Sequence, residues 1–269
     1  MTGVTARLGR IFAIALNTSR EAARNRVVYG IGVLAILMMV FVLVLGEMSQ
    51  HEEARVARDI SLASISFFGS VTAAILGVVL LYSEMQRRTI HPIVAKPLER
   101  WEFVVGKYLG IAMTLTMLVV VFAMTMMLLL WRQEVPLTAA VAKAVLLAYL
   151  EVLVVAAIAV FFSAFSTPFL SGVFTFVLFF LGRVTPEMRV ALESTESTAL
   201  TTVLRGALRV VPDLHLFSIS GRTLDGEHVS VNGDFVSWSY VGTTVGYGVV
   251  VIGVLLLLAA LIFQRRDFV

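Results

Sequence analysis

The sequence predicts an all-α polytopic membrane protein that forms one domain over residues 1–269. First, 59% of its residues are hydrophobic and only 14% are charged, whereas a soluble domain has about 45–50% and about 25%. Second, the mean hydropathy is +0.93, so much of the apolar surface must face lipid. Third, no segment between the apolar stretches is long enough for a soluble core of its own.

Six apolar stretches are candidates for membrane-spanning helices, each of which needs about 20 mostly apolar residues. The fifth, residues 169–181, is the shortest and falls furthest below that length. In chain order they cover residues 27–45, 60–82, 108–130, 139–162, 169–181 and 240–263.

The N-terminal segment, residues 1–26, predicts an amphipathic helix in the membrane interface. Its apolar run Ile11–Leu16 is too short for a signal peptide and leads into a basic stretch. A simpler alternative is that the segment only anchors the chain through its positive charge. The side chains that cluster on its apolar face are Leu8, Ile11, Phe12, Ile14 and Ala15.

The basic residues predict the orientation of the chain, because short cytoplasmic loops collect Lys and Arg. Residues 1–26, residues 83–107 and the C-terminal QRRDFV together hold twelve of the 21 basic residues. With six spans, all three segments fall on one side. We therefore expect both termini and the 83–107 loop to be cytoplasmic, with the protein in the cell's inner (cytoplasmic) membrane.

The long connection at residues 182–238 is then extracytoplasmic. Asp225-Gly226 and Asn232-Gly233 are turn signals that favour a small hairpin. An amphipathic helix at the outer membrane surface is also expected, since several apolar residues recur near a 3.6-residue period. These are Leu200, Val203, Leu204, Ala207 and Val210.

The 83–107 loop has the pattern of two short helices separated by a proline. Thr89 can cap a helix over Ile90–Lys96, and Pro92 is tolerated in its first turn. Pro97 ends this helix, and Leu98, Trp101, Val105 and Tyr108 then form one stripe of a second helix that enters span three. We expect a rigid projection, although topology and lipid binding alone could also explain its charges.

Arg100 lies on the side of the second helix opposite the stripe, where we expect it to be available to water or to a partner. Glu99 and Glu102 suit the positive N-terminal end of that helix.

Several kinds of chemistry are missing from the sequence. There is no cysteine, and no G-x-x-x-x-G-K-[ST] motif occurs, because the one Gly-Lys pair is followed by Tyr108. The four histidines have no H-E-x-x-H spacing, and no G-x-S-x-G is present. The eleven methionines suit helix packing better than copper transport. We expect no enzyme activity, metal or cofactor in this chain, and a net charge of +3 does not indicate nucleic acid.

Two charged residues fall within span four, where charge is costly and suggests a function. Lys143 is near the outer end and can reach the interface as an anchor. Glu151 is nearer the middle, and the sequence leaves two roles open: a structural hydrogen bond to a neighbouring helix, or a pathway or dimer contact. Eight residues separate them, about 12 Å along a helix, which is too far for direct pairing.

Three stretches of the chain resemble one transporter family. RRTIHPIVAKPLERWEFVVGKYLG resembles the segment after span two in permease subunits of type-2 ABC exporters, in the six-span branch with the nitrous-oxide-reductase maturation and gliding-motility permeases. SREAARNRVVYGIGVLAI resembles the family's N-terminal interfacial helix, and LIFQRRDFV its C-terminal ending. Together they cover about a fifth of the chain.

The resemblance implies a coupling helix at Thr89–Lys96 that binds an ATPase subunit, and it implies two such subunits with their ATP and Mg. It also implies a second copy of the chain or a related permease, and alternating access for export. A non-transporting membrane partner of an ATPase is the alternative, and lipid, glycan, drug, peptide and ion all remain possible substrates. The residues implied in ATPase coupling are Glu84, Arg87, Arg88, Thr89, Ile90, His91, Pro92, Ile93, Lys96, Glu99 and Arg100.

Overall fold

The computed structural model describes residues 2–48, 53–86, 99–134, 138–194, 197–218, 221–222, 228–229 and 237–265. Almost all of these residues are helical, which confirms the all-α prediction. The elements are α1 (Thr2–Ala23), α2 (Arg26–Met48), α3 (Glu53–Gln86), α5 (Arg100–Arg132), α6 (Ala139–Ser163), α7 (Pro168–Arg183), α8 (Thr185–Ser194), α9 (Thr198–Val210), the 3-10 turn η1 (His215–Phe217), β1 (Gly221–Arg222), β2 (His228–Val229) and α10 (Trp238–Arg265).

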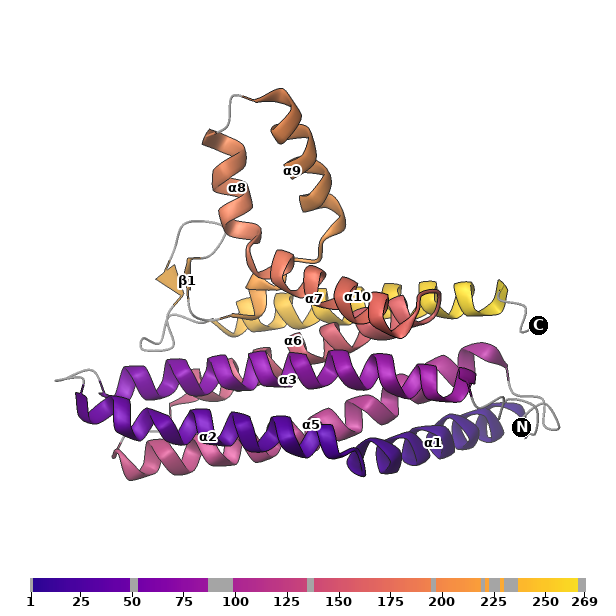
Figure 1. Ribbon diagram of the computed structural model, residues 1–269, viewed down its shortest axis with the longest axis horizontal. Coiled ribbons are helices and arrows are strands. Elements are labelled where there is room, and N and C mark those ends of the chain that lie inside the picture. The colour runs from indigo at the N-terminus through magenta and orange to yellow at the C-terminus, as the bar shows by residue number, and fades with distance from the viewer. Residues whose placement is uncertain are drawn as a thin grey trace.

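The long helices run side by side along one axis, and α8 and α9 stand out from them to one side (Figure 1). Among the residues that the structure describes, four helical segments are long and apolar enough to cross a membrane alone: Val56–Leu81, Arg100–Arg132, Ala139–Ser163 and Trp238–Gln264. Two bent pairs raise the number to six if each pair is one span. These are α1 with α2, bent by 63°, and α7 with α8, bent by 62°.

The helix α6 forms the centre of the bundle, since most of its residues from Leu147 to Val160 are buried. It packs most extensively against α3. The two helices approach so closely that a Cβ added at Gly77 would lie 2.5 Å from the Cβ of Ala159. A small residue on α3 therefore allows the backbones to come together, as is common between membrane helices.

The helix α1 packs lengthwise against the first half of α5 and runs parallel to it. Ile11 and Ala15 are buried in this contact, whereas Leu8 and Phe12 are 61% exposed. At Gly110 an added Cβ would lie 2.5 Å from the carbonyl oxygen of Ala15. The amphipathic N-terminal helix predicted from the sequence is thus present, and part of its apolar face is covered by α5.

The segment after α7 is more structured than a loop. The helices α8 and α9 form a hairpin, here called the α8–α9 hairpin (residues 185–210), and α9 confirms the amphipathic helix predicted there. The backbone N–H of Leu214 donates to the carbonyl of Gly182, 2.9 Å, which closes the base of this hairpin. The strands β1 and β2 pair antiparallel and confirm the predicted small hairpin in the connection.

Candidate functional site

Most of the predicted coupling residues lie outside the described part of the chain. Glu84 falls in the last turns of α3, although its side chain is not described, and Glu99 and Arg100 begin the next described segment. The predictions that lie outside the described residues concern Arg87, Arg88, Thr89, Ile90, His91, Pro92, Ile93 and Lys96. The described residues that follow this segment show how its end at Glu99 is held.

The residues that follow the segment form ion pairs with α1. Arg10 donates to both carboxylate oxygens of Glu102, Nε to Oε2 at 3.0 Å and Nη2 to Oε1 at 2.7 Å. Arg7 donates to Glu99 at 2.6 Å. The Glu102 side chain is fully buried, so its two bonds to Arg10 satisfy a charge that would otherwise be costly.

Arg100 joins the same region to the end of α10. Its Nη1 donates to the carbonyl oxygens of Phe263, 3.3 Å, and Gln264, 2.7 Å. The last carbonyls of a helix lack intrahelical partners, and a cation there also suits the helix dipole. The rings of Phe103 and Phe263 stack with centroids 5.7 Å apart. The expectation that Arg100 is left to water or a partner is therefore wrong: it is bonded within its own chain.

Together these residues form what we call the α5 clamp, which fastens the start of α5 to both α1 and α10. Its members are Arg7, Arg10, Glu99, Arg100, Glu102, Phe103 and Phe263.

Beside the clamp, Lys107 is almost completely buried on α5. Its Nζ lies 3.8 Å from Glu21 on α1 and 5.7 Å from the centre of the Phe103 ring. The sequence placed Lys107 among the charges of the cytoplasmic loop, but the structure uses it between helices.

Glu151 takes part in a second polar cluster, inside the bundle. Arg183, at the end of α7, binds it through two hydrogen bonds, Nε to Oε1 at 2.8 Å and Nη2 to Oε2 at 3.0 Å. Ser66 of α3 donates to the same carboxylate and accepts from Arg183. The guanidinium also lies over the ring of Phe179, 5.2 Å from its centre. This cluster joins α3, α6 and α7, and its geometry favours the structural role for Glu151.

Sequence reasoning missed Arg183 because it assigned this residue to the outer connection. One signal was present. Glu151 is a lone acid within a span, and Arg183 directly follows the apolar end of span five.

A third polar cluster holds the base of the α8–α9 hairpin. Asp213 accepts from the Thr185 hydroxyl at 2.7 Å and from Arg189 at 3.0 Å. Its backbone N–H donates to the Tyr247 hydroxyl of α10 at 2.8 Å. The other intramembrane charge, Lys143, lies over the Trp238 ring, 4.7 Å from its centre, which fits the anchoring role expected near the outer end.

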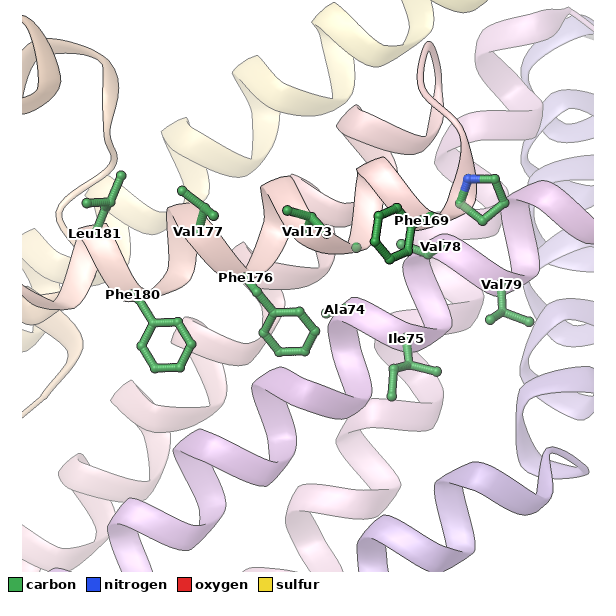
Figure 2. A pocket seen from close by; sticks show the side chains of 12 residues that line it. Ala74, Ile75, Val78, Val79, Phe169, Val173, Phe176, Val177, Phe180 and Leu181 are labelled. Carbon is green, nitrogen blue, oxygen red and sulfur yellow. The ribbon is translucent and has the colours of Figure 1, made fainter.

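An apolar groove of about 680 Å³ runs between α3 and α7. Figure 2 shows that aromatic side chains follow its α7 side, among them Phe169, Phe176 and Phe180. On the α3 side lie Ala74, Ile75, Val78 and Val79. Phe169 is 79% exposed, so the groove presents a large apolar surface outside the bundle.

The polar clusters hold helices together, and the groove offers an apolar surface for binding. Across the described ranges, no three His, Asp or Glu side chains gather in a way that could hold a metal ion. The ion pairs instead join helices that are far apart in the sequence.

A family model described as ABC-2 family transporter protein matches residues 12–268, nearly the whole chain. Among curated proteins, none matches it.

Proposed function

Because the chain belongs to the ABC-2 family of transporter proteins, we propose that it is a permease that exports or extrudes a substrate across the cytoplasmic membrane by alternating access. Members of this family are membrane subunits that work with an ABC ATPase. The resemblance of residues 87–110 suggests the six-span branch with the nitrous-oxide-reductase maturation and gliding-motility permeases. In this proposal both termini are cytoplasmic.

The α5 clamp is the observation that carries the proposal. Residues 87–98 connect α3, which ends at Gln86, to α5, which begins at Arg100. Immediately after this connection, ion pairs and a ring stack fasten α5 to α1 and α10. A force applied to residues 87–98 by a partner would therefore act on several helices together.

We propose that the partner is a pair of cytoplasmic ATPase subunits that bind ATP and Mg and contact the segment from Glu84 to Arg100. The sequence supports this site through Arg87 and Arg88, which can fix the register of a charged interface. Arg100 would then act within the clamp, since its guanidinium is bonded to α10.

The groove between α3 and α7 supports a second subunit. One bundle of six spans offers only one side of a central pathway, so alternating access requires two bundles. The groove is apolar, and several of its α7 residues are exposed. We propose that a second copy or a related permease covers this face.

Transport into proteoliposomes tests the function. The permease would be purified from its native membrane with any bound ATPase and reconstituted, and ATP-dependent movement of candidate lipid, glycan, peptide and drug probes would be measured. ATP-dependent movement of one of them supports the exporter. Hydrolysis without movement of any probe would favour the non-transporting alternative, and the absence of a bound ATPase would contradict both.

A further inference from the structure

The helix α10 forms hydrogen bonds with other parts of the chain toward its two ends, whereas its middle makes only apolar contacts. No residue between Gly248 and Ala259 is buried, and the structure describes all of them. Val250 and Leu257 are among the exposed side chains of this stretch. Figure 1 shows that α10 runs in the same general direction as the other long helices and is partly overlapped by α7 in this view. One side of this stretch packs on the bundle through partly buried side chains such as Val251, Ile252 and Leu255, so that the polar contacts of α10 are those toward its two ends.

The C-terminal end of α10 is bonded to the α5 clamp. Arg100 donates to the carbonyls of Phe263 and Gln264, and the ring of Phe103 stacks on Phe263. Ala259 and Phe263 are buried in this contact. A displacement of the start of α5 would thus move this end of α10 with it.

The other end of α10 is tied to the base of the α8–α9 hairpin. The Tyr240 hydroxyl donates to the carbonyl of Leu216 at 2.7 Å, and the Tyr247 hydroxyl accepts from the backbone N–H of Asp213 at 2.8 Å. Phe217 packs against Gly248, where an added Cβ would lie 3.2 Å from the Phe217 ring. The hairpin base therefore has three contacts with the outer part of α10.

The carboxylate of Asp213 extends this attachment to α8. It accepts from Thr185 and Arg189, the first of which is buried. The residues that follow α9, including Asp213, are thereby fixed to the start of α8 as well as to α10. The base of the hairpin should therefore move as one unit.

We propose that α10 is a connecting rod that transmits movement of the α5 clamp to the α8–α9 hairpin, with Arg100 as the positioning residue at its inner end. An α-helix is stiff along its axis, and the middle of α10 packs on the bundle only through partly buried apolar side chains, which form no hydrogen bonds or ion pairs. This inference rests on the proposed function for the source of the movement, which is an ATPase that displaces residues 87–98. It adds a specific route by which that movement reaches the opposite side of the molecule.

Single-cysteine labelling tests the proposal, and the sequence contains no cysteine that would interfere. An environment-sensitive fluorophore would be placed at Arg205, which is exposed on α9, in the complex of permease and ATPase. A second preparation would carry the label at Arg24, near the end of α1. The signal would be compared without nucleotide and after trapping with ATP, Mg and vanadate.

We expect the nucleotide-dependent change at Arg205 to be lost in Arg100→Ala, while the change at Arg24 is retained. Arg7→Ala is the matched control, because it removes an ion pair of the same clamp without touching α10. Tyr247→Phe removes only the hydroxyl that accepts from the backbone N–H of Asp213. This change should also reduce the response at Arg205. An unchanged response at Arg205 in both Arg100→Ala and Tyr247→Phe would overturn the proposal.

A measurement without the ATPase separates this inference from the proposed function. In the permease alone, amide hydrogen exchange across residues 211–218 should become faster in Arg100→Ala as well as in Tyr247→Phe. Exchange that responds to Tyr247→Phe alone would show that the two ends of α10 are not linked, even if the ATPase binds. Failure of the ATPase to bind would instead contradict the proposed function.

Discussion

Arg183 and Glu151, 32 residues apart in the sequence, meet through two parallel hydrogen bonds of 2.8 and 3.0 Å. The carboxylate is fully buried, while the side chain of Arg183 is 31% exposed. This geometry makes the arginine the partner that satisfies a charge within the bundle. It also pins the end of the short helix α7 to α6 and, through Ser66, to α3.

Removal of Arg183 should destabilise the protein strongly. Arg183→Ala leaves the carboxylate of Glu151 buried without its cation, and loss of one partner of a buried pair costs about 3–5 kcal/mol. The expected result is a lower thermal unfolding temperature and less monodisperse protein in detergent. Arg189→Ala is the control, since Arg189 is more exposed and pairs with a less buried carboxylate; its effect should be clearly smaller.

Glu151→Gln tests the two roles of Glu151. Because the carboxylate binds Arg183 and Ser66, we expect Glu151→Gln to lower stability, with partial recovery in Glu151→Gln combined with Arg183→Gln. Thermal unfolding of the single and double variants would measure this. Normal stability with altered transport or altered substrate-stimulated ATP hydrolysis would instead favour a pathway role.

The close contact of α1 with α5 can be tested at Gly110. A Cβ there would lie 2.5 Å from both the carbonyl oxygen of Ala15 and the Cβ of Thr18. Gly110→Ala should therefore push α1 away, and overpacking of this kind costs about 1–3 kcal/mol. Gly253→Ala is matched in chemistry but has nothing within 4 Å, so it should be neutral or slightly stabilising in a thermal unfolding assay.

A charge exchange tests the ion pair between α1 and α5. Glu102→Arg should destabilise the protein, since it places a cation against Arg10 in a buried position. Combining it with Arg10→Glu should restore part of the loss, because the opposite charges again face each other. Thermal unfolding of the two single variants and the double variant gives the coupling energy, and additive losses would show that the pair contributes little.

The contact with the ATPase should depend on the charge of the 87–98 segment. Reversal of Arg87 and Arg88 to Glu should weaken co-purification of the ATPase, since opposed like charges at an interface cost several kcal/mol. Ile93→Asp should weaken it too, with little dependence on salt. Both variants should still insert normally, and equal recovery of the ATPase from all variants would contradict the coupling site.

The orientation can be tested with single cysteines and a reagent that does not cross membranes. A cysteine in place of Arg24 should be protected in intact cells, whereas one in place of Arg132 should be labelled. Both positions are exposed at the surface of the structure, so reactivity reports the side of the membrane. Labelling at Arg24 would reverse the topology and remove the coupling assignment.

The helices were the part of the fold that hydropathy could predict. A helix lies over each of the six apolar stretches, because long apolar runs report burial or lipid contact directly. The ends of the helices were harder to predict. The helix α3 continues beyond its apolar run to Gln86, and α5 begins before its apolar run, at Arg100. Polar helical turns outside a span carry no hydropathy signal.

The partners of charged residues could not be predicted in the same way. Glu151 was recognised as unusual, but Arg183 could be chosen only by knowing that α6 and α7 are neighbours. The pairs of Arg10 with Glu102 and Arg100 with α10 join residues 92 and more than 160 positions apart. Without the packing of the helices, each arginine in the sequence has the same chance of being a topology signal, an anchor or a structural partner.

The α5 clamp also has a consequence for the biogenesis of the protein. Synthesis proceeds from the N-terminus, and α1 and α2 are made long before Glu102 exists to receive Arg10. The last tie, from Arg100 to Phe263 and Gln264, can form only after nearly the whole chain has been translated. Premature termination before Phe263 would thus leave the start of α5 tied to α1 but not to α10. If an ATPase subunit binds residues 87–98 as proposed, it would meet the complete clamp only in finished chains.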